Sequence, residues 1–277
     1  MSLGRFDLGR PGRSRQQRPL IVGVSSQGLA WLAPGQPDTA WESWTWAAPE
    51  DATVGFIDWL SHHAPHVGRS GRPVQVCLSP DIARHWMQPV PGQTASLAEL
   101  HAVATATAQR LWGDASDGGW LVTGQWQVDR ACLCTAVSEA WGRAWLEMRA
   151  RWGDLSVHTP LLLLLRRHSC RGGPGVAWPR DGWVVFSLAQ HSFVLHLNDG
   201  QLVDVRCVRS DAAQGAAALE AAAMQEARRE MLRLGGQPEP VYCPPDLAAS
   251  HWPQESSAAV QAALCVLRCS EELAHGN

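Results

Sequence analysis

The segment Arg72–Pro91, RPVQVCLSPDIARHWMQPVP, decides how the rest of the chain is arranged. Its first part alternates apolar residues in the pattern of a buried strand, at Val74, Val76 and Leu78. Ser79-Pro80-Asp81 then favours a turn, because proline fixes φ and the Ser and Asp side chains bond to nearby backbone. A second segment carries Trp86 and Met87 and stops at Pro91. We therefore expect a sheet strand that feeds a hairpin.

The composition is that of a globular chain. The 277 residues are 45% apolar and 18% charged, which is enough for one large domain or two modest ones. No window approaches the roughly 20 apolar residues that a bilayer span needs, and the run Leu161–Leu165 ends at Arg166. The N-terminus lacks the apolar stretch of a secretory signal. These features predict a soluble, cytoplasmic protein.

Several classes of site are disfavoured by what the chain lacks. All 23 basic residues are arginine, so a P-loop lysine and Schiff-base chemistry are excluded. The net charge of −3 argues against nucleic-acid binding, which normally needs a basic surface. The eight cysteines form no CxxC pair, and we interpret most of them as small buried hydrophobes. We therefore predict no metal site.

Residues 1–19 carry five arginines and one aspartate among Gly, Ser, Gln and Pro. Such a segment cannot bury an apolar core, so we expect a disordered basic arm. A basic arm can contact an anionic membrane surface or an acidic partner, whereas a merely solvated tail is the simpler alternative.

The remaining segments follow one pattern twice. The first copy contains three strands, a helix, the strand of the opening segment and the helix that follows it, at Leu20–Ser26, Gly28–Ala33, Ser43–Ala47, Asp51–His63, Val74–Leu78 and from Ser96. The second copy contains three strands, a long helix, a strand and a final helix, at Trp183–Ala189, Phe193–Leu197, Leu202–Val208, Ala212–Leu234, Val241–Cys243 and from Ser256. Gly172–Gly175 is the best boundary between them. The sequence therefore predicts an α/β protein of two related subdomains, 20–171 and 172–277.

The helix that ends the first copy is followed by further elements. Ser96 and Glu99 form an S-x-x-E capping box, which predicts a helix as far as Trp112. After it we expect three strands, at Trp120–Gln127, Ala131–Val137 and Leu155–Thr159, and two helices, which begin at Ser138 and Pro160.

These segments together resemble a known family. The stretches that carry the resemblance are VCLSPDIARHWMQPVP (76–91), SLAELHAVATATAQRLWG (96–113) and GWVVFSLAQHSFVLHLNDGQLVDVR (182–206). They look like the actin-like platform proteins of bacterial type IV pilus and type II secretion machines, namely the PilM type and the cytoplasmic domain of the GspL type. The similarity covers most of residues 20–245 and is a pattern of apolar segments and turns.

The resemblance implies an actin-like, ribonuclease-H-like fold of duplicated βββαβα subdomains with mixed sheets. It also implies a cytoplasmic scaffold at the inner face of the inner membrane. In such machines the scaffold docks onto the tail of a membrane-anchored platform protein and, in the secretion branch, onto the assembly ATPase.

Actin-like ATPases present a hairpin turn from each half to phosphate and Mg²⁺, where a carboxylate holds the cation and glycine lets backbone N–H groups approach phosphate. Here the first turn offers Ser25, Ser26 and Gly28 but no acidic residue, and the second, Ala189–Ser192, has neither Asp nor Gly. ATP hydrolysis is therefore disfavoured. Weak nucleotide binding through Ser25, Ser26 and Gly28 stays open as an alternative.

Tryptophan is unusually frequent, with 15 residues against four Phe and one Tyr. Because Trp is enriched at protein contacts, we expect at least one Trp-lined interface, although core packing is the simpler explanation for most of them. The residues we select as partner-binding are Trp41, Trp44, Trp46, Trp86 and Met87.

The sequence thus favours a non-catalytic, actin-like docking scaffold that needs no cofactor. The alternative is an Mg·ATP-binding actin-like ATPase with an atypical phosphate site.

Overall fold

The computed structural model describes most of the chain between residues 19 and 244. The described residues are 19–32, 41–48, 51–68, 73–90, 92, 96–114, 118–124, 126, 130–152, 155–169, 178–188, 191–209, 215–234, 239–244 and 260. The predicted basic arm apart from Pro19, the predicted boundary at Gly172–Gly175 and the last predicted helix apart from Val260 lie outside these ranges. The limits of the two predicted subdomains stay a prediction. No helix of the described part is long and apolar enough to cross a bilayer.

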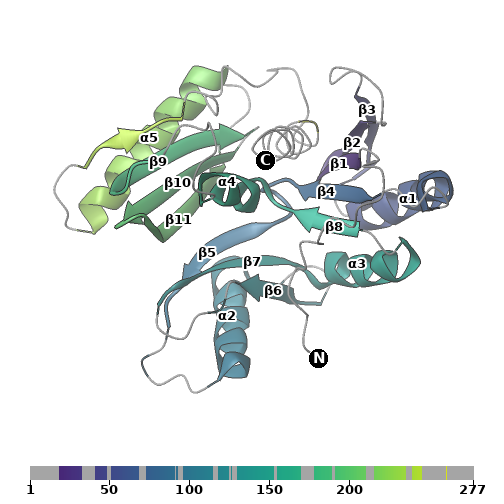
Figure 1. Ribbon diagram of the computed structural model, residues 1–277, viewed down its shortest axis with the longest axis horizontal. Helices are drawn as coiled ribbons and strands as arrows, with labels where there is room; N and C mark the ends of the chain where they lie inside the picture. The colour runs from purple at the N-terminus through teal and green to yellow at the C-terminus, as the bar shows by residue number, and fades with distance from the viewer. Residues whose placement is uncertain are drawn as a thin grey trace.

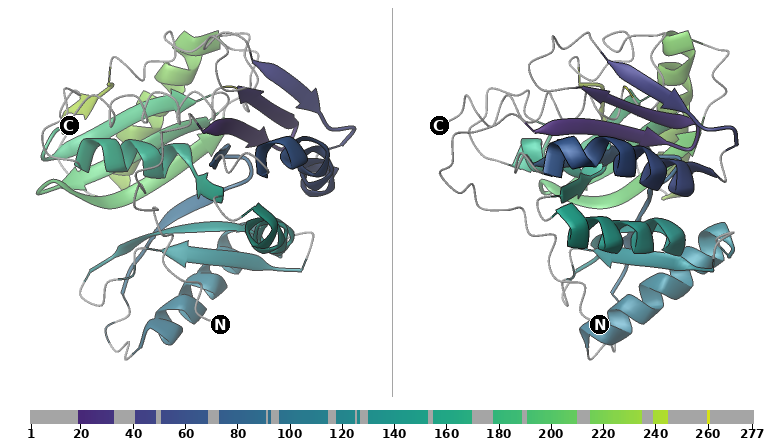
Figure 2. Two further views of the ribbon diagram at one scale, coloured as in Figure 1. Left: turned by 45° about the vertical axis from the view of Figure 1, so that its right-hand side comes forward. Right: turned by 90° about the vertical axis from the view of Figure 1, so that its right-hand side faces the viewer.

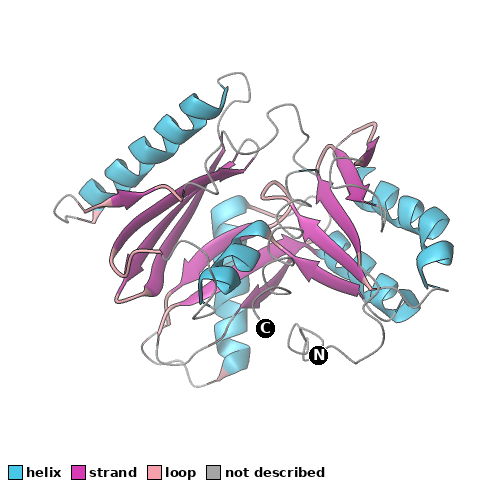
Figure 3. Ribbon diagram, turned by 45° about the horizontal axis from the view of Figure 1, so that its top comes forward, coloured by secondary structure: helices cyan, strands magenta, loops and turns pink. Residues whose placement is uncertain are grey.

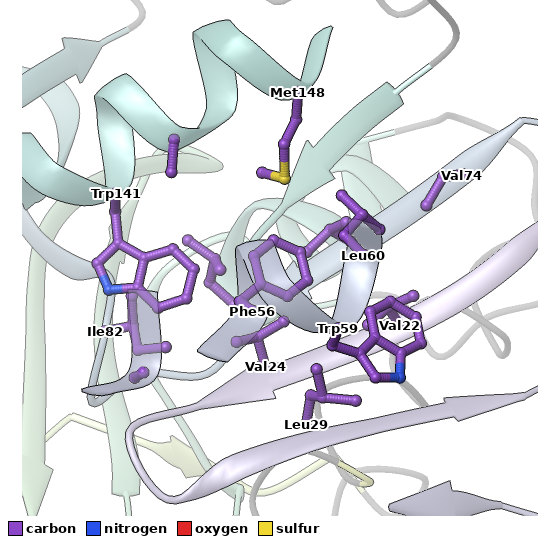
Figure 4. Close-up of a cluster of buried hydrophobic side chains, with 14 of the residues drawn as sticks. Val22, Val24, Leu29, Phe56, Trp59, Leu60, Val74, Ile82, Trp141 and Met148 are labelled. Carbon is purple, nitrogen blue, oxygen red and sulfur yellow. The ribbon is translucent and has the colours of Figure 1, made fainter. Parts of the chain in front are cut away.

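A five-stranded sheet forms the first half of the molecule (Figure 1). Its order is β3-β2-β1-β4-β8, with bounds Glu42–Thr45, Gly28–Leu32, Leu20–Ser25, Val74–Leu78 and Leu155–His158. β1 pairs antiparallel with β2 and parallel with β4, so the sheet is mixed. Helices α1 (Ala52–Gly68) and α3 (Glu139–Trp152) cover one face of this sheet. Figure 4 shows their side chains meeting those of the strands in one apolar cluster.

Aromatic side chains fill this first core. Phe56 and Trp59 of α1 are completely buried, and Trp59 packs against Trp31 of β2 with ring centroids 5.0 Å apart. Trp141 of α3 packs against Phe56 with ring centroids 5.6 Å apart (Figure 4). Phe56 and Trp59 lie three residues apart and therefore share one face of the helix. α3 likewise contributes to this core, with Trp141 and Met148 buried.

The second half repeats the topology of the first. Its sheet has the order β11-β10-β9-β12, with bounds Gln201–Arg209, His191–Asn198, Gly182–Leu188 and Val241–Tyr242. This is the order of the first four strands of the other sheet, which confirms the predicted duplication. The β10–β11 turn has positive φ at Asp199 (51°) and Gly200 (71°), a backbone conformation typical of tight hairpin turns. α5 (Gly215–Arg233) covers one face, and α4 (Pro160–Ser169) packs on the other.

A third sheet lies beneath both halves (Figures 1 and 2). Its order is β5-β7-β6, with bounds Arg84–Gln88, Cys132–Ser138 and Trp120–Gly124, and α2 (Leu97–Trp112) covers one face. On the opposite face, Val137 and Leu121 pack against the first core, whereas Leu133 and Met87 pack against the second. The sheet therefore bridges the two halves, and Figure 3 shows it beside both larger sheets.

The prediction of a hairpin in the opening segment is wrong. β4 and β5 both form where expected, but β4 pairs with β1 and β8, whereas β5 pairs with β7 in the third sheet. Between them the chain makes a helical turn, because the N–H groups of Ile82 and Ala83 both bond to Ser79 O at 3.0 and 3.1 Å. That turn redirects the chain from one sheet to another, so the segment joins two sheets.

The local signals for helices are confirmed with one exception. The Ser96 hydroxyl accepts from the N–H of Glu99 at 3.2 Å, and the Glu99 carboxylate accepts from the N–H of Ser96 at 3.0 Å, which completes the predicted capping box of α2. α1, by contrast, continues to Gly68, past the predicted end at His63 and through Pro65. A proline removes only one backbone donor, and a helix can continue past it when its other bonds remain.

Candidate functional site

The β1–β2 turn is the first hairpin turn that the resemblance assigns to phosphate. Ser25 is 1% exposed, and its hydroxyl donates to Gly28 O at 3.1 Å. The same oxygen accepts from the N–H of Gln27 at 3.3 Å. The Ser25 hydroxyl is therefore used within its own turn, where it stabilises the hairpin.

The backbone of Ser26 is bonded to a carboxylate from a distant part of the chain. Its N–H donates to Asp81 Oδ2 at 2.8 Å, across 55 residues of sequence. Asp81 belongs to the turn between β4 and β5, and this turn is held beside β1 because Ser79 N–H donates to Val24 O at 2.8 Å. A hydrogen bond from a backbone N–H to a carboxylate is charge-assisted and stronger than one between neutral groups. An acidic side chain therefore reaches this turn from the neighbouring turn.

Gly28 is required by close packing of β3 against the hairpin. A Cβ atom at position 28 would lie 2.3 Å from the backbone oxygen of Trp44. Trp46 fixes this approach, since its Nε1–H donates to Ser25 O and its backbone N–H donates to Gln27 O, both at 3.0 Å. The glycine that we had considered as a phosphate-facing residue therefore has a structural explanation.

The second hairpin faces the same region with histidine and serine. Its tip, Ala189-Gln190, lies outside the described residues, but the flanking Ser187 and Ser192 hydroxyls are 2.8 Å apart. His191 is 4% exposed, and neither ring nitrogen has a hydrogen-bond partner among the described residues. Burial lowers the pKa of His191 to about 4; the charge of Asp81 opposes this shift, and two arginines, Arg84 and Arg209, add to it. Asp81 therefore accepts a hydrogen bond from the first hairpin and acts electrostatically on His191 of the second.

Asp81 is the residue that sequence reasoning missed. We searched for a carboxylate only in the two hairpin turns, whereas the structure supplies it from the Ser79-Pro80-Asp81 turn. One signal was available, because Asp81 lies three residues after the end of β4, a buried strand that runs parallel to β1, and neighbouring parallel strands end at the same edge of a sheet. In the described ranges, no three His, Cys, Asp or Glu side chains come together as a metal site would need.

The predicted partner-binding residues do not form one surface. Trp44 is 48% exposed on β3, which is the edge strand of its sheet. Trp46 is half-buried by its bonds to the hairpin, and Trp41 packs against Ile21 and Cys77.

The other two predicted residues lie on β5, in a different sheet. Trp86 is 6% exposed and packs under α2, with its ring centroid 5.3 Å from that of Trp112. Met87 packs against the core of the second half. Of the five residues, Trp44 is the one that presents a broad side chain to solvent, so we retain it as the candidate contact.

Comparison with known proteins places this geometry in a structural class. No protein-family model matches the sequence, and no curated protein matches it. Among solved structures, a Bacteroides thetaiotaomicron protein with an actin-like ATPase fold and unknown function is similar at a TM-score of 0.50 and 8% identity, over 82% of this chain and 81% of that one. The chain has an actin-like fold.

Two further solved structures are similar at lower scores. A PilM–PilN type IV pilus biogenesis complex matches at a TM-score of 0.46 and 14% identity, over 82% of this chain and 81% of that one. The cytoplasmic domain of EpsL, an inner-membrane component of the type II secretion system of Vibrio cholerae, matches at 0.43 and 15%, over 90% and 94%. At these identities the likeness concerns the fold alone.

Proposed function

We propose that this chain is a non-catalytic, actin-like scaffold that acts by docking other proteins at the inner-membrane platform of a type IV pilus or type II secretion machine. We name these two machines because the segments 76–91, 96–113 and 182–206 resemble their actin-like platform proteins. In this proposal the chain works in the cytoplasm at the inner face of the inner membrane. Its partners are a membrane-anchored platform protein and, in a secretion machine, the assembly ATPase.

One observation carries the non-catalytic part of this proposal. The N–H of Ser26, which an actin-like ATPase would offer to phosphate, donates instead to Asp81 Oδ2 at 2.8 Å. A carboxylate at this position repels a phosphate group, because like charges a few ångströms apart are unfavourable in a partly buried setting. The Ser25 hydroxyl is hydrogen-bonded within the hairpin, and Gly28 packs closely against β3.

The docking part of the proposal rests on β3, the edge strand of the first sheet. Glu42, Ser43, Trp44 and Thr45 are all exposed, and β3 pairs with β2 alone among the described strands. An edge strand offers unpaired backbone groups to an added chain, and an exposed Trp beside them can anchor a partner. We therefore assign partner contact to β3 with Trp44 at its centre.

A photoreactive amino acid in place of Trp44 tests this assignment in cells. We expect light-dependent crosslinking to an integral inner-membrane protein, because the side chain at this position points away from the core. The same probe in place of Leu232, which is 80% exposed on α5, is the matched control and should give no such product. Equal products at both positions, or none at position 44, would contradict the assignment.

A binding measurement with the purified chain complements the crosslinking. Trp44→Ala should weaken capture of the crosslinked partner at least tenfold, since truncation of a hot-spot Trp at an interface costs about 2 kcal/mol or more of binding free energy. The unfolding midpoint of this variant should stay close to that of the wild type. Trp41→Ala and Trp46→Ala should lower the midpoint, because both side chains pack against the protein's own core.

A further inference from the structure

The turn between β4 and β5 delivers Asp81 in a fixed position. Ser79, Ile82 and Ala83 are 0%, 8% and 1% exposed, and three backbone hydrogen bonds hold the turn to β1 and to itself. Pro80 adds stiffness because its ring fixes φ. Because this turn is rigid, the Asp81 side chain loses little conformational entropy when it accepts from Ser26 N–H. The 2.8 Å hydrogen bond is therefore a fixed feature of the fold.

The contact has the chemistry of an anion site. A backbone N–H at a tight turn is a standard donor to oxyanions, and carboxylate and phosphate oxygens accept this bond in the same way. The arginines Arg84 and Arg209 act electrostatically on His191, as does Asp81, so positive charge lies around this region. The Ser79 hydroxyl, a further donor that can serve an anion, has no hydrogen-bond partner among the described residues. An anion therefore suits this position.

We propose that Asp81 is a built-in anion, whose carboxylate occupies the place that a phosphate group takes at the first hairpin of an actin-like ATPase and holds that hairpin without a nucleotide. The ligand class of the underlying site is a small oxyanion. This inference concerns the phosphate turn and holds whether or not Trp44 contacts a partner, so its test is independent of the docking proposal.

Chemical rescue of Asp81→Gly is the decisive experiment. The variant removes the carboxylate and leaves space beside Ser26 N–H. We expect its thermal midpoint to fall by several degrees relative to the wild type. Sodium formate or phosphate, at tens to hundreds of millimolar, should then raise the midpoint of the variant more than sodium chloride of equal ionic strength does. The wild type should show no difference between these salts, because its own carboxylate fills the site.

Asp114→Gly is the matched control, since Asp114 is exposed in the loop after α2. It should respond identically to formate, phosphate and chloride. If Asp81→Gly does not fold, Asp81→Asn replaces it: the amide oxygen still accepts from Ser26 N–H but carries no charge, so this variant should fold with a midpoint below that of the wild type, and an unchanged midpoint would overturn the proposal.

Two other results would overturn the proposal. One is an Asp81→Gly variant that unfolds at the wild-type temperature or that formate and phosphate stabilise no more than chloride. The other is a wild-type chain stabilised by phosphate as strongly as the variant, since the site would then be open. Partner capture through Trp44 should persist in Asp81→Gly, which separates failure of this inference from failure of the docking proposal.

Discussion

At the scale of single residues, the contacts around the β1–β2 turn show that typical ligand-site residues can have structural roles. Ser25, Ser26 and Gly28 match the composition of a phosphate turn, yet their groups bond to, or pack against, other parts of the chain. A hydroxyl or glycine in a turn indicates a ligand only when its donors are free to meet one.

The packing at Gly28 leads to a stability prediction. Gly28→Ala should lower the free energy of unfolding by about 1–3 kcal/mol or more. The new methyl group would lie 2.3 Å from the backbone oxygen of Trp44, and a shift of the backbone costs more free energy than a shift of a flexible side chain. Gly92→Ala is the control, since nothing lies within 4 Å of a Cβ at that position. Urea unfolding compares the two variants with the wild type, and equal stabilities would contradict the packing argument.

Buried histidines predict a loss of stability in acid. Burial lowers the pKa of His85 to about 3 and that of His191 to about 4, and burial with the nearby Arg166 lowers that of His158 to about 4. The unfolded chain binds protons near pH 6.5. Below that pH the unfolded state therefore holds more protons than the native state, so stability is complete above about pH 6.5 and falls as the pH drops toward 4.

The variant His85→Gln tests the size of this effect. His85 alone should account for on the order of 2 kcal/mol of stability lost between pH 7.5 and pH 5, because its native form stays neutral over that range. Glutamine cannot titrate but can still bond to the Thr135 hydroxyl, which lies 3.0 Å from His85 Nδ1. Urea unfolding at both pH values should show a smaller loss for the variant; the same loss in both proteins would refute the assignment.

At the scale of elements, local signals predicted more than long-range pairing did. The β1–β2 and β10–β11 hairpins and the capped helix α2 formed as expected, since turn residues and a capping box act within a few positions of the chain. The partner of β5 could not be predicted in this way, because β4 and β5 are both apolar and adjacent in sequence. Asp81 was missed for the same reason, since its contact with Ser26 spans 55 residues.

The bridging role of the third sheet leads to a prediction about β7. Leu133 is 8% exposed and packs against the core of the second half. Leu133→Ala should cost about 2–5 kcal/mol, because it removes buried methyl groups and leaves a cavity. Leu146→Ala, at a side chain 55% exposed on α3, should change stability by less than about 0.5 kcal/mol. Similar stabilities of these two variants in urea would contradict the bridging contact.

At the scale of the whole molecule, the β1–β2 turn of the first half lies near the second hairpin, because Asp81 bonds to Ser26 N–H and its charge acts on His191. The first hairpin contributes a turn bonded to Asp81, and the second contributes His191, Ser187 and Ser192. The duplicated α/β architecture could be predicted from the order of apolar segments, since that order repeats along the chain, whereas the actin-like fold was an implication of the family resemblance. The state of the site could not, because it depends on the contact between Asp81 and Ser26 N–H, which joins two turns 55 residues apart in the sequence.

The central proposal is that the Asp81 carboxylate occupies the β1–β2 turn in place of a nucleotide phosphate. Titration of the wild-type chain with Mg·ATP by calorimetry tests it most directly. We expect no saturable heat and, in a parallel melt, no rise in the unfolding midpoint.

Saturable binding, with a rise of roughly 5–10 °C at one hundred times the dissociation constant, would contradict the claim. Loss of that binding when Ser25 and Ser26 are both replaced by Ala would establish the alternative, an Mg·ATP-binding actin-like protein that uses Ser25, Ser26 and Gly28.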